Sequence, residues 1–354
     1  MKRALAILLG LGLLAAAPAA AQVPVVAEGP IRISLTGRIQ PQFNTSTADS
    51  VYSTFELRRA RVGVEVVIDR WIEGRVEWNF AHSSAGDVTS RLEDAFVDLV
   101  FDDAFRFQVG QFKKPFSRHD LTGSSRSLPV ETGLRIRGLD ADAEHHLLLD
   151  ENVYVGREIG AQIHGILGPV GYAAGVFNGS DQNARDVNDA KSYAARLTLK
   201  PFRFPFEIGA AASYRDRAVV DPLTDATETD TGLAIEVDAQ WGGFRQPGPY
   251  VLLEGMQAEN FMTADPMVGG IAIVAWFQPL ALFGRVEGIE PLVRASYGDP
   301  STRLDDDAGV LLTPGINVYV HGRNRLMLDW DYFLPELALA DPHSAIRGQL
   351  QLFF

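Results

Sequence analysis

The feature that most constrains the fold is a two-residue alternation of apolar and polar side chains, which recurs along almost the whole chain. One clear segment, residues 71–80, places Ile72, Val76, Trp78 and Phe80 on one face and Glu73, Arg75, Glu77 and Asn79 on the other. Because successive side chains of a β-strand point to opposite faces, this pattern predicts a strand between an apolar medium and water. A strand of a soluble protein can show the same alternation, so the number of repeats must decide between the two classes.

The alternation recurs often enough to predict about sixteen strands. They fall near residues 31–43, 53–68, 71–80, 92–101, 104–112, 158–165, 170–179, 193–200, 206–214, 233–241, 250–258, 269–278, 289–297, 312–320, 325–332 and 346–354. The segments at 250–258 and 269–278 alternate least clearly, and the last one ends on Phe354. Bacterial outer-membrane barrels have an even number of antiparallel strands. The repeats therefore predict an all-β, transmembrane antiparallel β-barrel rather than a soluble β-sandwich.

The connections between these segments alternate in length. Short ones lie at residues 69–70, 102–103, 165–169, 201–205 and 321–324, and longer polar ones at 44–52, 81–90, 113–157, 178–190, 216–230 and 299–307. Short periplasmic turns and long outer loops are typical of such barrels. A loop as long as residues 113–157 is uncommon unless it has a function. We expect this third long loop to fold inward and narrow the pore.

The segment at residues 53–68 changes its phase part of the way along. Its apolar side chains are odd-numbered at Phe55 and Leu57 but even-numbered at Val62 and Val64. One extra residue in a strand shifts the alternation in this way, and such bulges often re-aim side chains beside functional sites. The pattern predicts a β-bulge near Arg58 and Arg59.

The N-terminal 21 residues have the features of a secretory signal peptide. Lys2 and Arg3 precede an apolar run and the small-residue site Ala19-Ala20-Ala21, and the run is too short for a membrane-spanning helix. We therefore expect residues 22–354 to form the barrel, exported to the bacterial outer membrane. The chain has no cysteine, so an exported product would have no disulfide.

The charge balance is acidic. Without Lys2 and Arg3, 30 basic residues stand against 45 acidic ones, a net charge of −15. This balance argues against nucleic acid as a partner, because phosphates need a basic surface. It also opposes uptake of anions, although charges farther apart than a Debye length of about 10 Å are screened, so the field at a constriction is local.

Several motifs between residues 55 and 179 resemble the phosphate-selective porin O and P family of outer-membrane proteins. The matching residues are Phe55, Arg58-Arg59-Ala60-Arg61-Val62-Gly63, Glu93-Asp94-Ala95-Phe96, Gly110-Gln111-Phe112-Lys113, Pro115-Phe116-Ser117 and Phe177-Asn178-Gly179. The resemblance implies a sixteen-stranded barrel, a homotrimer and passive diffusion of small anions such as phosphate, with no cofactor. By motif position it implies a phosphate constriction formed by Arg58, Arg59, Asp94, Ser117 and Arg118, with Lys113 or Lys114 adjacent.

The residues themselves suggest a related hypothesis, with an alternative. Arginine presents a planar fork of donors that matches phosphate oxygens and stays charged at physiological pH. A basic lining could be formed by Arg58, Arg59, Arg61 and Arg75 together with Arg118, Arg126, Arg135 and Arg137 of the long loop. Alternatively, these arginines could pair across neighbouring strands with Glu56, Glu65, Glu73, Glu77 and Asp94 and serve only to hold the wall together.

Other function classes remain open from the residues alone. A barrel enzyme would need a nucleophile beside a base, for which Ser124 or Ser125 with His119 is the nearest pair, but we expect no enzyme. A soluble, secreted β-rich binding protein is a third class. A metal site at His145-His146 with Asp140, Asp142 and Glu144 lacks helical ligand spacing. We expect membrane lipid and lipopolysaccharide as partners, the acidic outer loops being able to bind bridging divalent cations.

Overall fold

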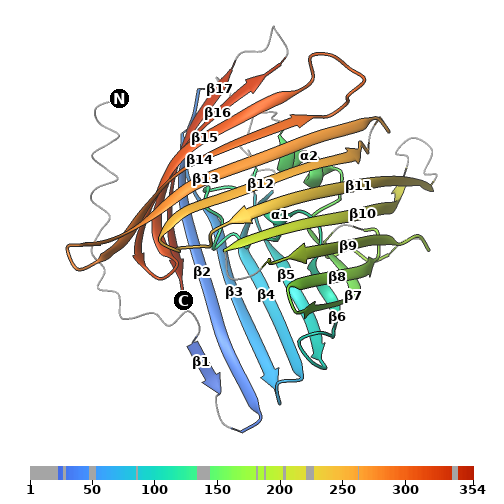
Figure 1. Cartoon of the computed structure of the whole chain (residues 1–354), viewed down its shortest axis with the longest axis horizontal. Helices are drawn as coiled ribbons and strands as arrows, with labels where there is room; N and C mark the ends of the chain where they lie inside the picture. Colours follow the sequence, from blue (N-terminus) through green and yellow to red (C-terminus); the bar gives the residue numbers. More distant parts are fainter. Residues whose placement is uncertain are drawn as a thin grey trace.

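The strands follow one another around a ring. The computed structural model describes residues 23–26, 29–47, 53–84, 87–133, 144–180, 182–186, 189–201, 205–220, 227–261, 263–336 and 342–354, so the expected signal peptide lies outside the described residues. The strands are β1 (Val23–Val26), β2 (Ile31–Ser46), β3 (Thr54–Ile68), β4 (Ile72–Ser84), β5 (Asp87–Val100), β6 (Arg106–Lys113), β7 (Arg157–Leu167), β8 (Val170–Phe177), β9 (Ser192–Leu199), β10 (Phe206–Val220), β11 (Thr227–Trp241), β12 (Gly248–Glu259), β13 (Pro266–Leu282), β14 (Val286–Asp299), β15 (Gly309–His321), β16 (Asn324–Pro335) and β17 (His343–Phe353). Figure 1 shows them as one continuous, strongly tilted wall.

The ring β2–β17 closes when the last strand pairs with the first. Each strand pairs antiparallel with its neighbour in sequence, and β17 pairs with β2 from Ala345↔Ser46 to Phe353↔Arg38. The predicted antiparallel barrel of sixteen strands is therefore confirmed. The short β1 was not predicted: it pairs with β2 at Val23↔Leu35, just beyond the point where β17 ends. There it covers backbone groups of β2 that the shorter β17 leaves without a strand partner.

Burial of the side chains is inverted relative to a soluble protein. Val237 is 64% exposed, whereas its neighbours Glu236 and Asp238 are only 2% and 6% exposed. The same pattern holds around the ring: apolar side chains face outward and charged ones pack inside. This arrangement is the one that a barrel in lipid requires.

The predicted bulge lies at Arg58. The β2–β3 register runs Gln40↔Arg59 and then Pro41↔Leu57, so Arg58 has no partner of its own. Outward-facing Phe55 and Leu57 below the bulge and Val62 and Val64 above it are all exposed, as their change of phase predicts. The bulge lets Arg58 and Arg59, adjacent in sequence, both reach the interior.

Some strands extend farther than the alternation predicts. The predicted loops at 81–90 and 216–230 are wrong in part, because β4 reaches Ser84 and β10 and β11 pair as far as Val220↔Thr227. The alternation marks only the part of a strand that lies in the apolar band of a membrane, so it does not show how far the backbone pairing continues.

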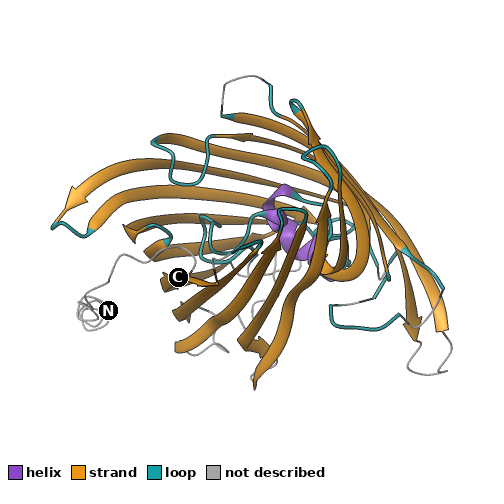
Figure 2. Cartoon of the chain, turned by 90° about the horizontal axis from the view of Figure 1, so that it is seen from below, coloured by secondary structure: helices purple, strands orange, loops and turns teal. Residues whose placement is uncertain are grey.

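The long connection between β6 and β7 folds into the barrel, as expected. It carries two short helices, α1 (Arg118–Leu121) and α2 (His145–Glu151), which Figure 2 shows inside the ring of strands. Neither these helices nor any other in the described residues is long and apolar enough to cross a membrane. We call residues 114–156 the inner loop.

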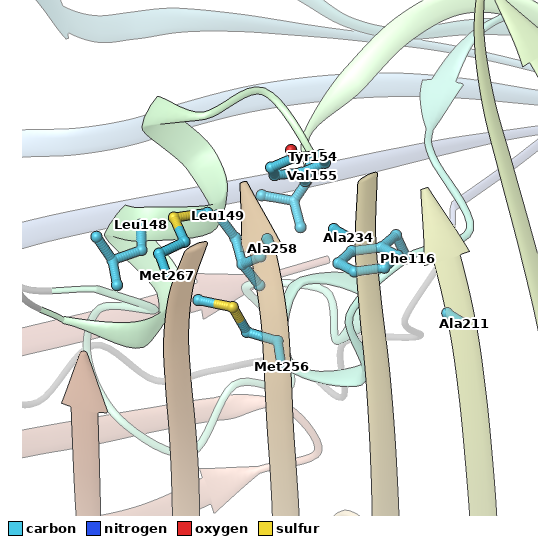
Figure 3. Packing of buried hydrophobic residues seen from close by; sticks show 10 residues of the cluster. All are labelled: Phe116, Leu148, Leu149, Tyr154, Val155, Ala211, Ala234, Met256, Ala258 and Met267. Atoms are coloured by element: carbon cyan, nitrogen blue, oxygen red, sulfur yellow. The ribbon is translucent and has the colours of Figure 1, made fainter. Parts of the chain in front are cut away.

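The inner loop is seated on one side of the barrel by apolar contacts. Phe116, Leu148, Leu149, Tyr154 and Val155 of the loop pack against Ala211, Ala234, Met256, Ala258 and Met267 of β10–β13 (Figure 3). A second cluster joins Leu128 of the loop to Leu252, Ile271 and Ile273. Apart from Glu254, most inward-facing side chains of β12 and β13 are therefore apolar, as are most outward-facing ones, which explains why residues 250–258 and 269–278 alternate poorly.

Candidate functional site

A cavity of about 1270 Å³ remains between the inner loop and the opposite wall. Its lining comes from β2–β7 and the inner loop, with Ser180 and Gln182 of the β8–β9 connection, Arg323 of the turn between β15 and β16, and Phe353 of β17. Because the loop is seated on β10–β13, it leaves the β3–β7 side of the barrel as the open side. Any solute that crosses this barrel through the cavity passes along that side.

Basic residues outnumber acidic ones in the lining. The eleven basic residues are Arg38, Arg58, Arg59, Arg61, Arg75, Arg91, Lys113, Lys114, Arg126, Arg157 and Arg323, and the six acidic ones are Glu65, Glu77, Asp94, Asp120, Asp150 and Glu158. Glu93 and Glu131 pair with this lining from behind it, which raises the acidic residues to eight. The wall keeps a basic excess although the whole chain is acidic.

Most of the candidate residues lie together in this lining. Arg58, Arg59, Asp94, Lys113 and Lys114, which the family motifs imply, border the cavity, as do Arg61, Arg75 and Arg126 of the arginine-lining hypothesis. Arg135 and Arg137 lie outside the described residues. The bulge of β3 and the inward face of β4–β6 therefore gather side chains that are up to 55 positions apart in sequence.

Ser117 and Arg118 lie elsewhere, against the far wall. Ser117 caps α1 and donates its hydroxyl to Glu254 of β12 at 2.6 Å. Arg118 donates to Gln240 of β11 at 3.0 Å and pairs with Glu207 of β10. Neither residue borders the cavity. Because the inner loop is seated on β10–β13, Ser117 and Arg118 at the start of α1 face those strands, whereas Asp120 and Leu121 of the same helix border the cavity.

The cross-strand pairs of the alternative interpretation are also present. Arg61 pairs with Glu77 at 3.0 Å and with Glu93 at 2.8 Å, and Arg75 pairs with Glu77 at 2.6 Å. Glu65 and Asp94 are further partners of Arg75, whereas Glu73 pairs with Arg106 and Glu56 accepts a hydrogen bond from Asn44. The arginines therefore both line the cavity and hold the wall together, so the two interpretations do not exclude each other.

Arg157 is a lining residue that the motifs do not single out. It begins β7 and binds two carboxylates of β5, with Nη1 3.0 Å from Glu93 and Nε 2.6 Å from Asp94. Arg38 and Arg91 were also missed. All three lie on the polar faces of their strands, but only the folded path of the inner loop shows which polar faces border open space.

The guanidinium groups of Arg58 and Arg59 are bound by a carboxylate of the inner loop. Glu131 accepts hydrogen bonds from Arg58 Nε at 2.9 Å, Arg59 Nη2 at 3.1 Å and Gln42 Nε2 at 2.8 Å. Burial of Glu131 opposes its ionisation, but the charges of Arg58 and Arg59 outweigh that cost and hold its pKa well below the usual range. Glu131 is therefore an anion in the folded loop.

Two arginines at one end of the cavity form no ion pair with a carboxylate of the described residues. Within this part of the chain Arg126 makes no side-chain hydrogen bond or ion pair, and Arg323 contacts Ser125 Oγ at 3.5 Å and the ring of Phe353. Burial and the nearby charge of Arg126 lower the pKa of Arg323. Gln351 donates to the carbonyl oxygens of both Ser125 and Arg323 and so holds these two segments together.

The contacts of the loop histidines and serines differ from those of a catalytic or metal site. His119 Nε2 lies 2.9 Å from the carbonyl oxygen of Thr132, and Ser125 Oγ accepts from Arg323, so no described contact joins His119 to Ser124 or Ser125. His145 Nε2 lies 2.8 Å from Glu254. No group of three or more His, Asp or Glu suited to a metal occurs among the described residues, and Asp140 and Asp142 lie outside them.

Solved structures with the same fold include outer-membrane proteins, among them a porin and a channel. The chain superposes on OmpT of Vibrio cholerae in its trimer form with a TM-score of 0.61, at 12% identity over 92% of this chain and 100% of that one. For an anion-selective porin from Comamonas acidovorans the TM-score is 0.62, at 10% identity over 92% and 100%. The outer membrane channel DcaP of Acinetobacter baumannii gives 0.60, at 10% identity over 92% and 99%. At these identities the likeness shows the fold alone.

The family is shown by a comparison of the sequence with models of protein families. No curated protein matches the chain. The model of the family described as phosphate-selective porin O and P matches residues 33–240, which is more than half of the chain and includes β2–β6, the inner loop and most of the basic lining. The chain therefore belongs to the phosphate-selective porin O and P family of outer-membrane porins.

Proposed function

We propose that this porin passes small hydrophilic anions by passive diffusion through the cavity beside β3–β7. The observation that carries the proposal is the lining, in which eleven basic side chains face six acidic ones. A pore discriminates by its width, its hydrogen-bond donors and the sign of charge at its narrowest part. The basic excess attracts anions into the cavity and repels cations from it.

The acidic balance of the whole chain does not oppose this selectivity. Charges separated by more than about 10 Å are largely screened at physiological ionic strength. Many acidic residues lie outside the cavity, among them Asp305, Asp306 and Asp307 in the β14–β15 connection. The field that an ion meets inside the barrel is therefore set by the lining.

Phosphate is the anion that we propose for this wall. The family description names it, and guanidinium groups bind phosphate oxygens through paired N–H donors. Within the lining, Arg58, Arg59, Arg61 and Arg75 would contact the ion, with Lys113 and Lys114 nearby and Asp94 holding Arg75 and Arg157 in place. Ser117 and Arg118 have no part in this proposal, because both face β10–β12.

Three copies would form the assembly in the outer membrane. The V. cholerae OmpT structure is a trimer form, and its fold covers 92% of this chain. The outward apolar side chains of the ring would contact lipid or another copy, and lipopolysaccharide would meet the outer loops. Native mass measurement of the detergent-solubilised protein tests this part, and a monomeric mass would contradict it.

The function is tested by reversal potentials in planar bilayers. Purified protein is reconstituted between unequal KCl solutions, and the sign of the reversal potential reports whether chloride or potassium crosses more easily. We expect chloride preference and inhibition of the chloride current by inorganic phosphate. A preference for potassium would overturn the proposed anion path and leave the barrel unaffected.

A further inference from the structure

We infer that Glu131 is an internal anion that occupies the Arg58–Arg59 site, so that a permeating anion must compete with the porin's own carboxylate for these two guanidinium groups. The inference rests on the proposed anion path and names the residue that sets its affinity. It concerns a residue of the inner loop that no family motif in this sequence includes.

The donors around Glu131 are those that an anionic ligand would need. Arg58 donates through Nε at 2.9 Å to Oε1 and through Nη2 at 3.3 Å to Oε2, which is a two-point contact with both oxygens. Arg59 and Gln42 add one hydrogen bond each, at 3.1 and 2.8 Å. Two guanidinium groups and an amide converging on one carboxylate form the kind of site that binds a free carboxylate or phosphate.

The site is placed so that an anion in the cavity can reach it. Arg58 and Arg59 border the cavity, whereas Glu131 lies behind them and its side chain is 3% exposed. The side chain of Arg58 is 20% exposed and is the more open of the two arginines. An anion arriving from the cavity therefore meets Arg58 first and draws it away from Glu131.

The side chain of Glu131 is not required to hold the inner loop in place, because other contacts fix the backbone of this segment. Its own carbonyl oxygen and that of Thr132 accept hydrogen bonds from Arg294 at 3.0 and 2.9 Å. The preceding backbone N–H of Val130 donates to Asp329 at 2.7 Å. Farther back, Asn317 and Arg325 bind the carbonyl oxygens of Leu128 and Ser127. The backbone of this segment is thus fixed to β14–β16 without any contribution from the Glu131 side chain.

Competition from an internal ligand weakens the binding of an external one. If the carboxylate occupies the arginines for all but about 1–10% of the time, the apparent dissociation constant of an incoming anion is about 10- to 100-fold higher than for the empty site. Such weakening suits a channel, because an ion held too tightly cannot leave. Glu131 would therefore let a strongly basic site pass anions rather than retain them.

The test measures how strongly inorganic phosphate inhibits chloride current through the reconstituted porin. Glu131→Gln keeps the shape of the side chain and removes its charge, and it should lower the half-inhibiting phosphate concentration about tenfold or more. Glu144→Gln is the matched control, since Glu144 is also a buried inner-loop carboxylate but binds Ser296 on β14 at 2.7 Å. It should leave the half-inhibiting concentration unchanged.

A second variant protects the test against misfolding. Glu131→Asp keeps the charge but withdraws the carboxylate by one methylene, and it should give a half-inhibiting concentration between those of the native porin and Glu131→Gln. Unchanged or weaker inhibition in either variant, with native-like folding, would overturn the inference. If the native porin prefers potassium, the proposed function fails instead, and the reversal potential distinguishes that result from a failure of the role of Glu131.

Discussion

Arg157 on β7 reaches across β6 to bind Asp94 on β5, with its Nε 2.6 Å from Oδ1. Its Nη1 lies 3.0 Å from Glu93, whose side chain is fully buried. One guanidinium thus binds two carboxylates on a strand with which β7 does not pair. Since β7 follows the inner loop directly, Arg157 also fixes the end of that loop to the wall that faces the cavity.

Replacing Arg157 should destabilise the barrel. Arg157→Ala removes one partner from each of two carboxylates, of which Glu93 keeps Arg61 and Asp94 keeps Arg75. Breaking a buried ion pair costs about 3–5 kcal/mol when nothing replaces the lost partner, and the remaining arginines reduce that cost here. We expect a clearly lower thermal unfolding midpoint for the folded barrel in detergent. Arg303→Ala is the control, because that side chain is 68% exposed in its pair with Asp265 and such pairs contribute at most about 1 kcal/mol. Equal midpoints for the two variants would contradict the role given to Arg157.

The selectivity of the pore should depend on Arg58 and Arg59 but not on Arg118. Replacing Arg58 and Arg59 together with Ala removes two charges from the cavity lining, so the reversal potential should shift toward potassium. Arg118→Ala removes a charge that is paired with Glu207 away from the cavity and should leave the reversal potential unchanged. A shift of the reversal potential caused by Arg118→Ala alone would show that Arg118 contributes to the ion selectivity.

The fold could be predicted from the sequence because the rule that sets it is local. Each strand must present apolar side chains to lipid at every second position, and the bulge at Arg58 is visible as a break in that rule. The alternation of apolar and polar side chains is lost where the inner face of a strand is covered by protein instead of water. At Leu252 and Ile271 the inner loop covers the wall, so both faces are apolar and the alternation fades.

The sequence predicts the direction of a candidate side chain only where the residue lies on a strand. Arg59, Arg61 and Arg75 point inward because the pleat of β3 and β4 dictates it. The positions of Ser117 and Glu131 depend instead on where a loop of more than forty residues turns, which is decided by packing against β10–β16. That packing joins residues more than a hundred positions apart, such as Ser117 and Glu254, and no local pattern records it.

The attachment of the inner loop should weaken as the pH falls through about 6.5. Burial lowers the pKa of His119, more than the nearby Glu254 and the Thr132 carbonyl raise it, so the folded loop holds this ring neutral. The unfolded chain binds the proton more readily, with a pKa of about 6.5, and stability present above that pH is lost below it. Protonation of His119 should therefore contribute a fall in the unfolding midpoint between pH 7.5 and 5.5.

A substitution of His119 separates its contribution to the pH dependence of stability from the contribution of loop carboxylates such as Glu131. His119→Asn removes the titrating group, so the fall between pH 7.5 and 5.5 should become smaller. Glu131 acts in another range: its depressed pKa contributes stability above the usual glutamate value of about 4.3, which is lost only as the pH falls below it. If the unfolding midpoint of His119→Asn changed with pH above 5 as strongly as that of the native porin, the pH dependence would not come from His119.

Gly110 should be the strand glycine that tolerates a side chain least. Its φ is +129°, and a Cβ built there would lie 2.2 Å from the carbonyl oxygen of Ala95 and 2.7 Å from the Cα of Phe96. Both are backbone atoms of β5 and cannot move aside without breaking the β5–β6 pairing, which holds Gln111 against the carbonyl oxygens of Leu92 and Glu93. Backbone strain of this kind costs about 1–3 kcal/mol before any clash is counted. Gly110→Ala should therefore reduce the yield of folded barrel, measured by its heat-modifiable electrophoretic mobility. Gly74→Ala is the control, because a Cβ at that position would lie 3.6 Å from its nearest neighbouring atom. Equal amounts of folded barrel for the two variants would show that the backbone of β5 can move to accept a side chain at Gly110.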